Sequence, residues 1–160
     1  MWNIVGTLAS IGGLWFSILA WLRAKDAKAA AEGARRAVRQ GNAAEDLRHL
    51  ATKARDLLHF VENDQLNAAR IRSGDLILDI TLAQHRWKAF LPEENRTQLA
   101  EAGKKAGMVT RALAAVDEAV EAETRAKLVN ACRELVSRLA AESGKIQSNV
   151  DRENDNARAD

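Results

Sequence analysis

Apolar residues recur with helical spacing along most of this chain, and the first such stretch carries no charge. Residues 2–22 contain no Asp, Glu, Lys or Arg. At about 1.5 Å rise per residue, a helix of that length reaches roughly 30 Å, the thickness of the hydrocarbon core of a bilayer. The pattern predicts a transmembrane helix over residues 1–22.

The two faces of this predicted helix differ in side-chain size. Large apolar residues follow one face, and small or polar residues follow the other at alternating spacings of 3 and 4. Lipid gives helices no hydrophobic reason to associate, so close packing along small residues has to supply the attraction. We therefore expect a homo-oligomer that packs along Asn3, Gly6, Ser10, Gly13, Ser17 and Ala20.

The small-residue face continues beyond the apolar stretch, through Ala24, Ala27, Ala31 and Ala34 in the same register. We expect residues 23–41 to form a basic, alanine-rich helix that prolongs the first one, to roughly 60 Å in all. Alanine is also the best helix former, so an isolated stalk is the alternative. Packing between copies is favoured, because glycine and serine in the apolar stretch have no such helix propensity.

Local charge predicts the orientation. No Lys or Arg precedes the apolar stretch, which argues against a cleaved signal peptide. Basic residues directly after it outnumber acidic ones, and the positive-inside rule then places residues 23–160 in the cytoplasm of a bacterial inner-membrane protein, with the N-terminus outside. The same residues could contact anionic lipid headgroups. They are Arg23, Lys25, Lys28, Arg35, Arg36 and Arg39.

Residues 42–147 contain four further apolar stripes with helical spacing, which predict a small helical bundle with antiparallel neighbours. Gly41 and Asn42 predict a helix stop and a new N-cap. Asp64 is expected to cap the next helix, in which Gly74 could introduce a kink. The stripes run from Leu47 to Val61, Leu66 to Phe90, Leu99 to Val120 and Leu128 to Leu139.

The connections and the C-terminal end complete this outline. Pro92 fits the first turn of the helix that follows it, and a shift of register at residues 121–124 predicts a turn. Residues 148–160 lack apolar periodicity, which predicts a disordered tail. The fold class is therefore all-α: one transmembrane helix, its alanine-rich continuation and a helical bundle.

Composition adds little about function. Aromatic residues make up only 4% of the chain, and no alternating run predicts a strand. A net charge of +2 gives no support to nucleic-acid binding. The lone Cys132 excludes an intramolecular disulfide.

Residues with chemical potential are few. None of the three histidines has a His or Cys one turn away, so metal-site spacing is absent. Arg55 and His59 lie one turn apart and could form a general base beside a cation, but a solvated pair is favoured because no nucleophile is nearby. Trp87, Phe90 and Cys132 fall on apolar stripes and are expected to pack. We predict neither an enzyme nor a cofactor.

The uncharged anchor and the stretch WLRAKDAKAAAEGARRAVRQ resemble small single-span membrane effectors encoded beside bacterial antiviral systems, such as the membrane accessory protein of type VI-B CRISPR loci. The resemblance covers Trp2 to Gln40 and lies in composition. It implies a ring-shaped membrane oligomer that dissipates the membrane potential. Arg55 and His59 are closer together than in the ribonuclease-like motif of that family, which argues against RNA cleavage.

Two functions follow as expectations. The first is a homo-oligomeric inner-membrane effector that forms a pore or disrupts the membrane in antiviral defence, with Asn3, Thr7, Ser10 and Ser17 available to face water. The same side chains would equally serve a dry helix interface. The alternative is a membrane-tethered scaffold whose bundle recruits a cytosolic protein partner.

Overall fold

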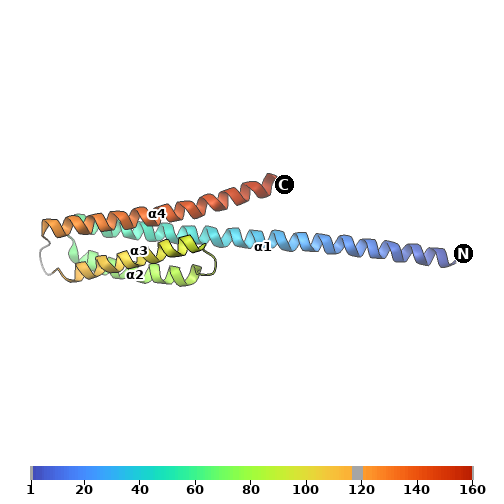
Figure 1. Ribbon diagram of the computed structural model, residues 1–160, viewed down its shortest axis with the longest axis horizontal. Helices are drawn as coiled ribbons and strands as arrows, with labels where there is room; N and C mark the ends of the chain where they lie inside the picture. The colour runs from blue at the N-terminus through green and yellow to red at the C-terminus, as the bar shows by residue number, and fades with distance from the viewer. Residues whose placement is uncertain (1, 117–120, 160) are drawn as a thin grey trace. The chain divides into compact units, whose positions relative to one another are not determined.

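The computed structural model describes the backbone of residues 2–116 and 121–159, and the side chains of residues 20–116, 121–152 and 155. The described residues form four helices and no strand (Figure 1), which confirms the all-α prediction. The helices are α1 (Trp2–Glu62), α2 (Leu66–Trp87), α3 (Glu93–Ala114) and α4 (Ala122–Ala159). The chain divides into two compact units, Met1–Val38 and Arg39–Asp160.

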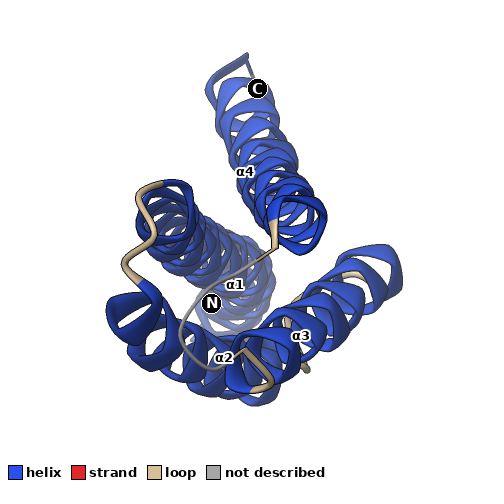
Figure 2. Cartoon of the chain, turned by 90° about the vertical axis from the view of Figure 1, so that its left-hand side faces the viewer, coloured by secondary structure: helices blue, strands red, loops and turns tan. Residues whose placement is uncertain are grey.

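The second unit is a helical bundle, as predicted. The C-terminal part of α1 packs there with α2, α3 and α4, and successive helices run in opposite directions (Figures 1 and 2). Its centre holds the apolar stripes expected from the sequence. The largest fully buried side chains include Leu47, Leu57, Leu76, Ile80, Leu113, Leu135 and Leu139.

Small residues allow the helices of the bundle to approach closely. Ala54 and Ala102 are fully buried. At Gly103, a Cβ atom would lie 2.9 Å from Nε2 of Gln84 and 3.3 Å from Cγ2 of Ile80, so α3 meets α2 where a side chain would crowd both. Gln84 uses this proximity to donate a hydrogen bond of 2.9 Å to the carbonyl oxygen of Leu99.

The predicted break at Gly41 and Asn42 is wrong, because α1 continues through both residues to Glu62. A glycine inside a helix costs about 1 kcal/mol relative to alanine. Directly after it, Ala43, Ala44 and Leu47 are buried in the bundle. Burial of that helical face offsets the unfavourable propensity of one glycine, and a continuous helix results.

The connection from α1 to α2 also differs from its prediction. Asp64 has a left-handed backbone (φ 55°), and Gln65 takes the N-cap position without a side-chain hydrogen bond. A short aspartate is among the residues that tolerate that conformation. Asp64 therefore turns the chain and does not cap α2.

Within α2, Gly74 causes no break, and the predicted stripe from Ala69 to Trp87 is buried. The stripe ends one step early: Phe90 lies in the turn after α2 and is 40% exposed, whereas Leu91 is buried. Pro92 occupies the N-cap position of α3, one residue before the helix begins.

The last two differences concern α4. It begins at Ala122, inside the predicted turn, whereas Val120 lies outside the described residues. The tail predicted to be disordered is helical instead, because α4 continues from residue 148 to Ala159. Ile146 and Val150 are buried, which extends the apolar stripe of α4 past the point where the sequence pattern weakens.

Within the part of the chain that the structure describes, no helix is both long enough and apolar enough to cross a membrane. This finding gives no support to the predicted single span. The side chains of residues 2–19, which make up most of that predicted span, lie outside the described residues.

Candidate functional site

Part of α1 is exposed on every side. All side chains of residues 20–36, which we call the exposed segment, are open to solvent. Five residues of the predicted oligomerisation face belong to it: Ala20, Ala24, Ala27, Ala31 and Ala34. The other five, Asn3, Gly6, Ser10, Gly13 and Ser17, lie on the same helix, but their side chains are outside the described residues.

Five of the six predicted headgroup residues also lie in the exposed segment, namely Arg23, Lys25, Lys28, Arg35 and Arg36. The ammonium group of Lys25 lies 5.7 Å from the ring centroid of Trp21, which is 63% exposed. Lys28 is 3.9 Å from the carboxylate of Glu32. An indole beside lysines suits the interface between lipid and water.

The sixth residue, Arg39, belongs to the bundle. Its guanidinium group lies 4.6 Å from the ring centroid of Phe90, a cation–π contact between α1 and the turn after α2. This contact gives both residues a structural role. Arg39 is also exposed, so its contact with lipid headgroups stays a prediction.

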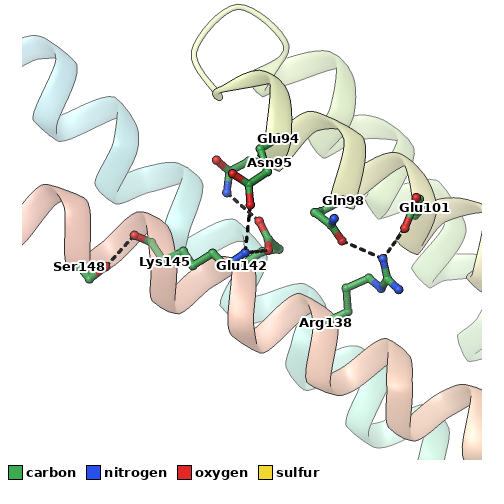
Figure 3. Close-up of polar contacts among 8 residues, drawn as sticks. All are labelled: Glu94, Asn95, Gln98, Glu101, Arg138, Glu142, Lys145 and Ser148. Atoms are coloured by element: carbon green, nitrogen blue, oxygen red, sulfur yellow. Dashed lines mark hydrogen bonds and ion pairs between the residues drawn. The ribbon is translucent and has the colours of Figure 1, made fainter.

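A polar network joins α3 to α4, as Figure 3 shows. Asn95 donates a hydrogen bond of 2.7 Å to Oε2 of Glu142, and Lys145 donates one of 2.9 Å to Oε1. Glu142 is only 5% exposed. The hydrogen bond to Glu142 raises the pKa of Lys145, and the charges of Glu142 and Glu94 add to the effect.

The network extends along the same two helices. Arg138 donates a hydrogen bond of 2.7 Å to Oε1 of Gln98 and pairs with Glu101 (Figure 3). Both carboxylate oxygens of the buried Glu142 have partners, so this carboxylate is not a free acid or base. The arrangement fixes how α3 and α4 align, because any other register would leave a buried charge unpaired.

The lone cysteine is poorly placed for chemistry. Cys132 is fully buried. Burial, and to a lesser extent the charge of Glu62, raises the pKa of its thiol from 9.0 to about 11. The thiolate is the reactive form, so this thiol is a weak nucleophile at neutral pH.

Arg55 and His59, the pair considered as a general base, are both exposed. The imidazole of His59 lies 3.1 Å from Nδ2 of Asn63, and His49 lies 3.2 Å from Glu45. The described residues contain no group of three His, Cys, Asp or Glu side chains that could hold a metal ion. The histidines therefore have ordinary surface partners or solvent around them.

A hollow of about 430 Å³ lies where α2 ends and α3 begins. Its charged lining mixes His85, Lys88 and Arg96 with Glu93, and all four side chains are exposed. Because the lining carries charges of both signs, it has no electrostatic preference for one class of ligand.

One surface was missed by the sequence reasoning. Ile71, Leu78 and Leu82 are 70%, 60% and 51% exposed and share the outward face of α2. The signal was present: these residues recur at spacings of 7 and 4, out of register with the buried stripe. A helix with apolar residues on two faces offers a second surface for packing, and the periodicity of the inner stripe alone does not reveal it.

No family model, no curated protein and no solved structure matches this chain.

Proposed function

We propose that this protein is a membrane-anchored homo-oligomer that assembles along the small-residue face of α1. The observation that carries the proposal is the continuity of α1: one helix runs from Trp2 through the exposed segment to Glu62. Register is kept along a continuous helix, so the alanines of the exposed segment and the small residues before them share one face.

The exposed segment supports this proposal in two ways. Its alanines are exposed and offer a face on which a second helix can approach closely. Its basic residues, beside the exposed Trp21 and Leu22, suit a helix leaving an anionic bilayer surface.

The functional form we favour is an inner-membrane effector that forms a pore or disrupts the bilayer. In this form the bundle has a structural role, and its described residues contain no His, Cys, Asp or Glu group that could hold a metal ion. Asn3, Thr7, Ser10 and Ser17 are the side chains that would face water in a conducting assembly.

The test is the mass of the full chain extracted in detergent, measured by light scattering and corrected for bound detergent. We expect a discrete oligomer that dissociates when Gly6, Ser10, Gly13 and Ser17 are changed to leucine. The matched control changes Ile4, Ile11 and Ile18 to leucine on the opposite face and should leave the mass unchanged. A wild-type mass unaffected by the first set would contradict assembly along this face.

A scaffold that recruits a protein partner is the second candidate, and the exposed apolar residues of α2 favour it. Release of a small dye from vesicles separates the two functions. Leakage caused by the wild type and lost in the four-leucine variant supports the effector. An oligomer that binds vesicles without causing leakage supports the scaffold function instead.

A further inference from the structure

The outward face of α2 carries an apolar stripe made of Ile71, Leu78 and Leu82. The spacings of 7 and 4 place the three side chains on one side of the helix, opposite the fully buried Ile80. Single exposed apolar residues are ordinary, but a stripe along one helix is typical of an interaction surface.

Two polar residues flank this stripe and lack partners. Asp75 and His85 are both exposed, and within the described residues neither makes a hydrogen bond or an ion pair. The charged residues near them on α2 do have partners: Asp79 pairs with Lys53, and Arg86 pairs with Asp46 at 2.8 Å. The carboxylate of Asp75 can therefore accept a hydrogen bond from the imidazole of His85 in another molecule.

The stripe and its flanking residues are arranged symmetrically about Ile80. Leu78 and Leu82 are equally spaced on either side of it, and so are Asp75 and His85. Ile80 points into the core, so residues at equal distances before and after it lie at mirrored angles on the outward face. Two antiparallel copies of α2 would bring such residues together in pairs.

We propose that α2 forms a two-fold symmetric contact with α2 of a second copy of this chain. Leu78 of each copy meets Leu82 of the other, and Asp75 of each copy meets His85 of the other. A two-fold contact uses one self-complementary surface twice, so every favourable pair occurs twice.

The alternative orientation is unfavourable. Parallel copies of α2 would place the Asp75 carboxylates of the two molecules together, and like charges in contact repel. The antiparallel arrangement has no such pair along the stripe. The proposed occupant is therefore a second copy of this chain, matched by a hydrogen bond between carboxylate and imidazole as well as by apolar surface.

This contact goes beyond the assembly proposed for α1 and does not depend on it. An oligomer could use both surfaces, one in the N-terminal helix and one in the bundle. The four-leucine variant of α1 described above separates them, because it should reduce the assembly to dimers held by α2.

The first experiment is disulfide cross-linking of full chains in detergent. Cys132 is buried and should not cross-link, so cysteines can be introduced singly at Leu78 or Leu82. Mixed Leu78→Cys and Leu82→Cys chains should cross-link at least about threefold more than either variant alone, because identical positions are offset along antiparallel helices. Lys104→Cys, an exposed position on α3, is the control for random collisions.

The second experiment exchanges the polar pair in the four-leucine background. Asp75→Lys or His85→Asp alone should weaken dimerisation about tenfold, since each affects two exposed pairs. The double variant with both changes should restore the dissociation constant to within about twofold of its background, because the introduced lysine and the introduced aspartate would place opposite charges face to face.

Three results would overturn the proposal. One is equal cross-linking by the mixed pair and by Lys104→Cys. Another is a double variant as weak as its parents, which would exclude the antiparallel register. The third is binding of vesicles that requires Ile71, Leu78 and Leu82 without any cross-linked dimer, which would assign the stripe to lipid.

Discussion

Two groups of alanines in α1 have the same local sequence character and opposite environments. Ala24, Ala27 and Ala31 are exposed, whereas Ala43, Ala44 and Ala54 are fully buried. Both groups follow helical spacing in one continuous helix. Periodicity therefore defines a face, but the presence of α2, α3 and α4 decides whether the chain itself covers that face. The uncovered face is the one available to other molecules.

The largest expected difference between the two parts of α1 comes from truncating a large side chain. Leu57→Ala in the bundle should lower the free energy of unfolding by about 2–5 kcal/mol, because Leu57 is fully buried. Val38→Ala, at a position 62% exposed, should change it by less than about 0.5 kcal/mol. Urea unfolding of the full chain in mild detergent, followed by circular dichroism, measures both. Equal effects would mean that the core lies elsewhere.

Alkaline pH provides a second contrast. The Cys132 thiol has its pKa raised from 9.0 to about 11, so above pH 9 the unfolded chain loses this proton before the folded chain does. The free energy of unfolding should then fall as pH rises, by about 1.4 kcal/mol per pH unit and roughly 3 kcal/mol by pH 11. Urea midpoints between pH 8 and about pH 10 follow this change.

Cys132→Val is the control, since it removes the titrating group and keeps an apolar side chain. The chain contains no tyrosine that would titrate in the same range. The ion pair of Lys145 is lost only above the ordinary lysine value of 10.5, because its own pKa is raised. A Cys132→Val chain with the wild-type slope would refute the assignment to Cys132.

In labelling at neutral pH, Ala29→Cys in the exposed segment should react much faster than Cys132.

Enlarging an alanine tests the comparison most directly. Ala54→Leu should destabilise the bundle by about 1–3 kcal/mol, because extra methyl groups have no space in a packed core. Ala31→Leu should leave unfolding of the bundle unchanged and, if copies assemble along α1 as proposed, lower the mass of the detergent-extracted protein. Parallel urea titrations and light scattering distinguish the two effects. If Ala31→Leu changed neither quantity, the exposed alanines would be a stalk.

The smallest effect concerns a single hydrogen bond that joins α4 to α1. The hydroxyl group of Ser143 donates a hydrogen bond of 2.8 Å to the carbonyl oxygen of Ala44. Ser143→Ala should cost about 1 kcal/mol, because a buried carbonyl loses its side-chain partner. Ser148→Ala is a suitable control, since its hydroxyl bonds within α4 and is exposed. Thermal unfolding of both variants compares a hydrogen bond between two helices with one inside a single helix. The midpoint should fall more for Ser143→Ala than for Ser148→Ala.

The sequence by itself determined the helical class and most of the buried residues. Side chains at spacings of 3 and 4 share one face of any helix, so the stripes from Leu47 to Val61 and from Leu128 to Leu139 could be identified without coordinates. The alanine-rich composition of residues 23–41 also favoured a long helix there. These are local properties, and local geometry suffices to predict them.

Tertiary structure decided what local rules leave open. It carried α1 through Gly41, because burial of the following residues outweighs the preference of one glycine. It paired Asn95 with Glu142 across α3 and α4, a contact between residues far apart in the sequence. It also left Ile71, Leu78 and Leu82 outside the core. Which of two apolar faces a helix buries depends on its neighbours in space, and spacing along one helix contains no information about them.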